Sequence, residues 1–400
     1  MPGSHASQLP ANPEPGGEFS QNIKARQAEL NDKGQKAAAL LKEYADQGDL
    51  LADKVARAAA LNGNLRCAIP AGETLDAGFP LPPAPSHATL LAADGSQINP
   101  SRHSQVEYCE INIGVIQLAL GSGAPPETTI RSELLDVARL YTPSGIISEG
   151  AVALLRDLNE RKVLIEMVNQ QPGPVITLTD GPLELFREPK ETANFEKSLD
   201  EYLDVLTQLA HTGAATAGFV DKPRSDLVVR LLEVAALAED RLGQAGKEHP
   251  FLGLDDKTLF RDILAAPGAR SALFAIQSVS AQKFTGELAL HFFFLNVGRP
   301  GHPWLVRVEI PAWVACNPDA LRNLHAVLVA QSEIMGTAQP YPYLLHRAHE
   351  VAVVTLDDQE QLERMIDIEM RNQGVEMGEV SHKQSSKDQS SSSTKKRYGK

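Results

Sequence analysis

Two short apolar segments that each run into an Asp-Gly pair are the strongest constraint on how this chain folds. Residues 90–93 precede Asp94-Gly95, and residues 175–179 precede Asp180-Gly181. Apolar or β-branched runs of this length are typical of buried strands, and Asp-Gly favours a turn. Each pair therefore predicts a carboxylate at the C-terminal end of a buried strand.

Two such carboxylates on neighbouring strands would suit a hard divalent cation. Mg²⁺ and Mn²⁺ prefer carboxylate oxygens, and metal ions about 4 Å apart support in-line phosphoryl chemistry in nucleases. The leading hypothesis from these residues is a metal-dependent nuclease. For either motif alone, the alternative is an ordinary turn.

Composition excludes several classes of protein. The 400 residues are 42% hydrophobic, which is enough for one large or two medium globular domains. The apolar stretches are too short to span a bilayer, and the N-terminus lacks a basic region followed by an apolar core, so a cytoplasmic protein without membrane contact is expected. The three cysteines, Cys67, Cys109 and Cys316, are far apart and form no zinc pattern.

The net charge of −13 at first argues against nucleic-acid binding, because duplex-binding proteins usually present a basic surface. Carboxylates gathered around metal ions would raise the acidic count, however, while local basic patches still contact phosphates. One such patch contains Lys222 and Arg224. Another is the tail, in which residues 383–400 hold six Lys or Arg and one Asp; its alternative is a solvated segment without a specific role.

The pattern along the chain predicts four parts. Residues 1–18 form a disordered N-terminus; residues 19–85 form a helical arm of one or two amphipathic helices followed by a Pro-rich linker; residues 86–375 form the catalytic domain; and residues 376–400 form a disordered, basic, Ser-rich tail. The arm is a candidate surface for a partner or for a second copy of the chain.

Within the catalytic domain, strands and helices alternate. The predicted strands include a meander that starts at the first Asp-Gly and a pair at 287–297 and 304–310. The predicted helices cover residues 144–170, 194–211, 225–243, 318–335 and 343–354. The fold class expected is α/β, with a mixed β-sheet and flanking helices.

Two glutamates in the predicted helix 144–170 compete as a further metal ligand. Glu166 lies between Ile165 and Met167, whereas Glu160 lies in a charged run. A carboxylate among apolar residues has to be paired, protonated or metal-bound, whereas one in a charged run is usually solvated. Glu166 is therefore preferred, with an ordinary boundary glutamate as its alternative.

A second candidate cluster lies near the C-terminus, where Tyr341 and His349 are eight residues apart. They would lie two turns apart on one helix face if the helix extended back to Tyr341. Imidazole can bind a metal or carry a proton, and a Tyr hydroxyl can bind a phosphate. The alternative for each is an aromatic residue with a purely structural role.

Taken in order, several short motifs make the chain resemble the NurA nuclease domain from about residue 89 to 354. The motifs are residues 94–103, 111–114, 180–183, 218–222, 307–313 and 341–349. The second Asp-Gly is followed by Pro182, where serine is frequent in the family; proline stiffens the turn without removing a ligand.

This resemblance implies an RNase H-like core and a homodimer with Mn²⁺-dependent 5′ to 3′ exonuclease and single-strand endonuclease activity on single- and double-stranded DNA. It implies work in DNA end processing and repair beside a HerA-type hexameric ATPase. By resemblance, Asp94, Asp180 and His349 are metal ligands, with Mg²⁺ as the other cation, and Tyr341 is catalytic. Glu166, or else Glu160, is the helical ligand. Lys222 and Arg224 are expected to hold backbone phosphates.

Two other classes remain open. A non-catalytic accessory subunit of a DNA translocase would use the helical arm and lack metal-dependent cleavage. A phosphodiesterase acting on RNA or nucleotides would share the core, because a fold does not determine the substrate.

Overall fold

The computed structural model describes residues 18–100, 106–135, 137–142, 145–171, 173–185, 193–336 and 339–374. The segments predicted to be disordered, 1–18 and 376–400, lie outside these ranges except for Glu18, with which the first helix begins. The last part of the first motif, residues 101–103, also lies outside them.

The centre of the molecule is a five-stranded part of a mixed sheet. Its strands run in the order β5-β4-β3-β8-β9, in which β4 is antiparallel to both neighbours and β3, β8 and β9 are parallel. Their bounds are Ala88–Ile98 (β3), Cys109–Leu120 (β4), Glu127–Leu135 (β5), Val175–Asp180 (β8) and Ala215–Val220 (β9). An antiparallel meander followed by two parallel crossovers is the order of an RNase H-like core. The predicted α/β fold class and meander are confirmed.

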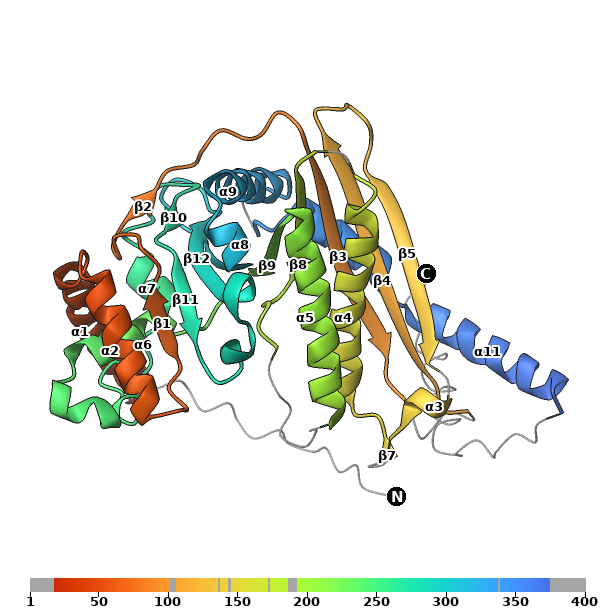
Figure 1. Ribbon diagram of the computed structural model, residues 1–400, viewed down its shortest axis with the longest axis horizontal. Helices are drawn as coiled ribbons and strands as arrows, with labels where there is room; N and C mark the ends of the chain where they lie inside the picture. The colour runs from red at the N-terminus through yellow and green to blue at the C-terminus, as the bar shows by residue number, and fades with distance from the viewer. Residues whose placement is uncertain are drawn as a thin grey trace, which may run out of the picture.

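Antiparallel strands extend the same sheet beyond β9 (Figure 1). They are, outward from β9, β13 (Leu305–Pro311), β12 (Leu290–Asn296), β11 (Phe274–Gln277) and β1 (Cys67–Pro70), with β10 (Arg270–Ser271) and β2 (Gly78–Phe79) beside them. The predicted strand pair is confirmed as β12 and β13. A separate two-stranded sheet joins β6 (Tyr141–Thr142) to β7 (Gly145–Ile146).

Helices cover both faces of the sheet. On one face α4 (Glu149–Val168) and α5 (Ala193–Thr212) lie side by side (Figure 1). On the other face lie α8 (Ala312–Ala315), α9 (Pro318–Ile334) and α10 (Tyr343–Ala352). Side chains alternate along β3, so Leu91 and Ala93 join the core under α4 and α5, whereas Leu90 and Ala92 join the core under α9 and α10. By the same alternation, Asp94 belongs to the α10 face.

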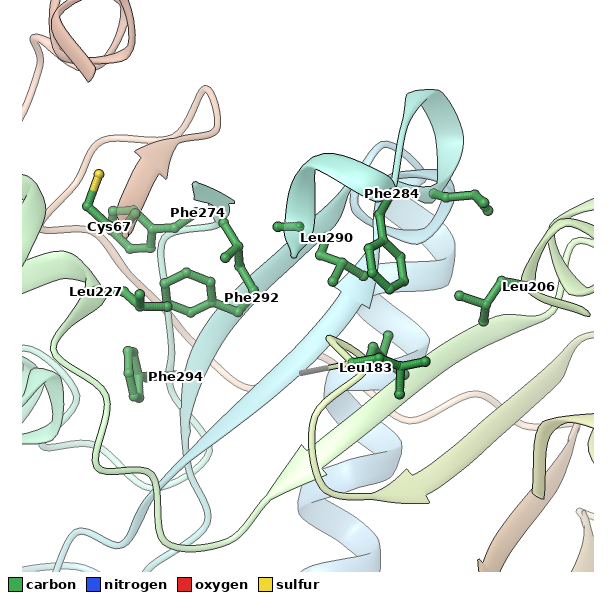
Figure 2. Close-up of a cluster of buried hydrophobic side chains, with 14 of the residues drawn as sticks. Cys67, Leu183, Leu206, Leu227, Phe274, Phe284, Leu290, Phe292 and Phe294 are labelled. Atoms are coloured by element: carbon green, nitrogen blue, oxygen red, sulfur yellow. The ribbon is translucent and has the colours of Figure 1, made fainter. Parts of the chain in front are cut away.

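The predicted N-terminal helices are present as α1 (Glu18–Glu43) and α2 (Gly48–Leu61). They pack against α6 (Leu227–Ala236), α7 (Asp256–Phe260), the 3-10 helix η1 (Glu239–Gln244) and β1. Figure 2 shows the core beneath them, where Phe274 and Phe292 lie between Cys67 of β1 and Leu227 of α6. The arm thus shares a core with the far end of the sheet.

The remaining elements are short or peripheral. They are α3 (Val137–Leu140), η2 (Ala281–Lys283), η3 (Gly286–Leu288) and α11 (Leu356–Asn372). The helix predicted for residues 225–243 is wrong in its second half, because α6 ends at Ala236 and η1 follows. Helix α11 has no buried residue and points away from the sheet (Figure 1). Among the described residues, no helix has the length and apolar character needed to cross a membrane.

Candidate active site

Asp94 and Asp180 lie next to each other at the edge where β8 ends. The parallel register pairs Ala93 with Thr179, so the next residue on each strand is an aspartate. Both side chains point to the α10 face. Side chains alternate along a strand, and the residues two positions earlier, Ala92 and Leu178, lie in the core on that face. The sequence prediction that these two carboxylates meet at one sheet edge agrees with this arrangement.

The two Asp-Gly pairs nevertheless differ in backbone structure. Gly181 has a φ of 82°, so the second pair forms the expected turn. The first pair was wrongly predicted to end its strand: β3 continues to Ile98, and Asp94 pairs with Gly114 of β4. Gly95 is required for a different reason, since a Cβ there would lie 2.5 Å from Cγ of Arg156 on α4.

The C-terminal pair reaches these carboxylates from the α10 side. His349 Nδ1 lies 2.7 Å from Asp94 Oδ2, and the Tyr341 hydroxyl donates to Asp180 Oδ1 at 2.8 Å. Helix α10 begins at Tyr343, so the two residues do not share a helix face and instead contact different carboxylates. The ring of Tyr341 packs edge-on against buried Phe219, with centroids 5.5 Å apart, which fixes its position.

Asp221 adds a third carboxylate that the sequence analysis did not select. It directly follows β9, and Phe219 of that strand pairs with Asp180. Its Oδ1 accepts a hydrogen bond from Trp304 Nε1 at 3.1 Å. The sequence does contain a signal for Asp221, because an apolar run precedes it just as one precedes Asp94 and Asp180. No glycine follows Asp221, however, so the segment was assigned only to a basic patch.

The carboxylates repel one another electrostatically. Burial raises the pKa of Asp180, the bond from Tyr341 counteracts this, and the charges of Asp94 and Asp221 raise it further. The pKa of the Tyr341 hydroxyl is raised by burial and by the Asp180 carboxylate. Tyr341 therefore stays protonated near neutral pH and acts as a hydrogen-bond donor.

The structure reverses the expectation for the two glutamates of α4. Glu160 is 3% exposed, and burial raises its pKa to about 8; the Arg161 guanidinium, 2.8 Å away, opposes this rise, and the charges of Asp157 and Asp94 add to it. Glu166 is exposed to solvent. The physical reason is the direction of the helix: α4 leads back to the start of β8, so its later turns lie away from the C-terminal ends of the strands. Of the two, only Glu160 is brought to the Asp94 edge.

A buried glutamate on β13 holds the backbone that follows Asp180. Glu309 is 0% exposed, and its Oε2 accepts hydrogen bonds from the amides of Leu183 at 2.8 Å and Glu184 at 3.3 Å. Its other oxygen accepts from Arg307 at 2.6 Å. In the sequence, Glu309 stands within an apolar strand, and only its place in the motif 307–313 sets it apart. Nothing there indicates that it holds the turn after Asp180.

The two predicted phosphate-binding residues are both exposed. The Lys222 side chain is 71% exposed and its Nζ lies 3.8 Å from Asp221 Oδ2, while Arg224 follows two residues later. The structure thus brings Lys222 to the edge of the carboxylate cluster. It shows no contact between Arg224 and the carboxylates.

The carboxylate oxygens at this edge are the kind of ligand that a hard divalent cation prefers. Within the described ranges, no three His, Cys, Asp or Glu side chains have the arrangement of a ready-made metal site. Asp94 and Asp180 nevertheless supply adjacent hard oxygen donors, and part of the raised pKa of Asp180 comes from like charges that a cation would offset. The residues therefore fit a Mg²⁺- or Mn²⁺-type ion.

Together, the strand order and the acidic edge define an α/β protein with an RNase H-like core and a carboxylate site at the edge where β8 and β9 end beside Asp94 of β3. The sequence model of the NurA domain matches residues 88–354, a range that contains the whole acidic edge together with Tyr341 and His349. The chain belongs to the NurA domain family. A search of curated proteins found no match.

Several solved structures are similar in fold. The NurA nuclease of Sulfolobus solfataricus is 13% identical, with a TM-score of 0.42, over 88% of this chain and 98% of that chain. The catalytic domain of human Endonuclease V is 14% identical, with a TM-score of 0.31, over 80% of this chain and 98% of that chain. Ciona intestinalis Endonuclease V, solved in complex with DNA, is 10% identical, with a TM-score of 0.31, over 70% of this chain and 87% of that chain.

Proposed function

We propose that this protein is a metal-dependent DNA nuclease that hydrolyses phosphodiester bonds at the edge formed by Asp94 and Asp180. The observation that carries the proposal is the register of β3 and β8, which sets the two aspartates side by side with His349 and Tyr341 bonded to them. Adjacent carboxylates facing a tyrosine donor suit the binding of metal ions and of a phosphate at one place. Membership of the NurA domain family supports the proposal.

Each residue has a distinct role in the proposed reaction. Asp94 and Asp180 would hold Mn²⁺ or Mg²⁺, with His349 and Glu160 beside them; Glu160 replaces Glu166 in this set. When bound, the cation supplies Lewis-acid activation of the phosphate and of a water molecule. Tyr341 stays protonated, and its single O–H, which donates to Asp180 in the structure, would turn to a phosphate oxygen when DNA binds; Glu309 keeps the turn after Asp180 in place.

The finer properties belong to the same proposal. They are a preference for Mn²⁺, 5′ to 3′ exonuclease and single-strand endonuclease activity, a role in DNA end processing and repair, a homodimer, and a HerA-type hexameric ATPase as partner. The family membership supports them. The net charge of −13 supports delivery of DNA by a partner, because an acidic surface attracts DNA weakly.

The experiment is cleavage of a 5′-labelled duplex and a 5′-labelled single strand with Mn²⁺, Mg²⁺ or EDTA. Asp94→Asn should lower the rate by at least about 100-fold, because it removes a charged ligand at the reacting phosphate. Asp32→Asn, on the exposed face of α1, is the matched control and should cleave like the wild type. Cleavage in EDTA, or full activity of the Asp94 variant, would refute the proposal.

A further inference from the structure

A cavity of about 370 Å³ adjoins the carboxylate edge on the β9 side. Asp221 forms one wall, so the cavity lies beside the candidate active site and shares this carboxylate with it. Its lining includes Lys222 from the turn after β9, Lys257 and Thr258 of α7, Arg261 directly after α7, and Trp304 directly before β13. Its volume is at the lower end of the range for small-ligand sites, which is about 300–1,000 Å³.

The cations of this cavity are accessible to a ligand. The Arg261 side chain is exposed and makes no hydrogen bond or ion pair with any residue in the described part of the chain. Lys257 lies 3.7 Å from Asp255, whose Oδ1 accepts two hydrogen bonds from Thr258, from its amide at 2.9 Å and its hydroxyl at 2.7 Å. Oδ1 of Asp255 is thus occupied with the start of α7, and its Oδ2 is the atom that lies near Lys257; Lys257 and Arg261 both line the cavity.

Trp304 supplies a fixed aromatic surface between these cations and the carboxylates. Its indole donates to Asp221, its amide donates to Asn296 Oδ1 at 3.0 Å, and its carbonyl accepts from Val297 at 3.0 Å. It is only partly buried and packs against the core under α9 and α10. A tryptophan whose backbone is fixed by two hydrogen bonds and whose indole is fixed by a third is a surface on which a planar group can stack with little loss of entropy.

From this combination we infer that the cavity binds one unpaired nucleotide of the strand being cut, next to the scissile phosphate. The base stacks on Trp304, and Lys257 and Arg261 hold its flanking phosphates. The nucleotide has to be unpaired because both faces of a base within a duplex are covered by its neighbours. The inference rests on the proposed nuclease function and deepens it by naming the side chains that would hold a single-stranded segment of at least two nucleotides.

The phosphate contacts are tested by measuring the affinity for a fluorescent oligothymidylate from its fluorescence anisotropy. EDTA is present so that no cleavage occurs. Each phosphate contact on a single strand contributes about 0.7 to the slope of log K against log salt. The Lys257→Ala/Arg261→Ala variant should therefore have a slope flatter by about 1.4. Lys36→Ala/Arg322→Ala, a pair of exposed cations elsewhere, is the matched control and should keep the wild-type slope. An unchanged slope in the Lys257/Arg261 variant would contradict the phosphate contacts.

The stacking contact is tested with two substitutions of Trp304. Trp304→Leu should weaken binding roughly 5- to 150-fold, the range measured for loss of one stacked base, and Trp304→Phe should keep most of the affinity. Phenylalanine also loses the bond to Asp221, so weakening of both variants alike would contradict stacking. Thermal unfolding of both proteins checks that the fold is intact. Equal affinity of the wild-type protein for a blunt duplex would contradict the requirement for an unpaired base.

The outcomes separate this inference from the proposed function. If the wild type cleaves, Asp94→Asn does not, and the Lys257/Arg261 variant keeps the wild-type KM and salt slope, the nucleotide site is wrong and the nuclease stands. If no protein cleaves but the salt slope and the Trp304 effect are as expected, the nuclease assignment is wrong and the nucleotide site stands.

Discussion

At the scale of single residues, buried carboxylates define this molecule. Glu160, Glu309 and Asp256 are all buried: Glu160 pairs with Arg161 on its own helix, Glu309 pairs with Arg307 on its own strand and accepts from the amide of Leu183, and Asp256 accepts from the amide of Val228 on α6. A buried charge persists only where such partners satisfy it. The amides that bind Glu309 and Asp256 are distant along the chain, so the residues beside these two carboxylates in the sequence gave no indication of those contacts.

Glu309→Ala should destabilise the fold by about 3–5 kcal/mol, since it leaves Arg307 and two amides buried without a partner. The free energy of unfolding in urea measures this. Glu239→Ala is the control: its carboxylate pairs with Arg57, its side chain is 61% exposed, and the expected cost is at most about 1 kcal/mol. Equal costs for the two variants would show that Glu309 does not hold the turn.

Asp256 should make stability depend on pH. Burial raises its pKa to about 7 from the usual 3.8, although it accepts hydrogen bonds from the amides of Val228 and Val229. The folded state therefore binds the proton more tightly than the unfolded state, so stability from this group is fully present below about pH 4 and is lost as the pH rises to about 7.

Asp256→Asn removes this titration but keeps an oxygen that can accept both amides. The difference in unfolding free energy between the variant and the wild type should grow by a few kcal/mol from about pH 4 to pH 7, in favour of the variant. Urea unfolding across that range measures it. Parallel pH profiles for the two proteins would contradict the raised pKa.

At the scale of elements, the close approach of β9 to the turn after β8 positions the second aspartate. A Cβ on Gly218 would lie 2.5 Å from the carbonyl oxygen of Gly181, so this position of β9 accommodates only glycine. Glu309 holds the same turn from the β13 side. Two neighbouring strands thus determine where Asp180 points.

Gly218→Ala should therefore cost about 1–3 kcal/mol of stability and lower cleavage, because the turn and Asp180 have to move. Gly63→Ala is the control, since a Cβ there meets no atom within 4 Å and the expected change is within about 0.5 kcal/mol. Thermal unfolding and cleavage rates of both variants measure these effects. A fully active Gly218 variant would contradict the role of this contact.

The sequence predicted most elements of the core where the hydrophobic period was long and regular. Helices α4, α5, α9 and α10 and the strand pair β12 and β13 were found close to their observed bounds. Strands β1, β11 and β5 and helix α11 were not predicted. Strands β1 and β11 are only four residues long and are stabilised by pairing with strands distant in sequence. Helix α11 has no buried face that would impose a regular hydrophobic period on its sequence.

At the scale of the whole molecule, the N-terminal helices and the sheet share one core. Leu51 of α2 is fully buried in the cluster that also contains residues of β1, α6 and β12. A separate arm on a linker would have its own core instead. We therefore expect the helices and the sheet to unfold together in one transition.

Leu51→Ala should cost about 2–5 kcal/mol and shift that single transition as a whole. Leu50→Ala is the matched control on the neighbouring residue, which is 54% exposed, and should change stability by less than about 0.5 kcal/mol. Unfolding followed by tryptophan fluorescence and by circular dichroism measures both. Two separate transitions, with only one affected by Leu51→Ala, would show that the arm folds independently.

The sequence by itself determined the α/β class and selected Asp94 and Asp180, because hydrophobic period and turn chemistry are local properties of the chain. Tyr341 and His349 were selected by their side-chain chemistry and by the family resemblance. Only the tertiary structure decided which residues complete the site. Asp221 joins through strand order, Glu160 rather than Glu166 joins through the direction of α4, and Glu309 joins through the pairing of β13 with β9. Burial and electrostatic coupling depend on neighbours distant in sequence, so no local pattern records them.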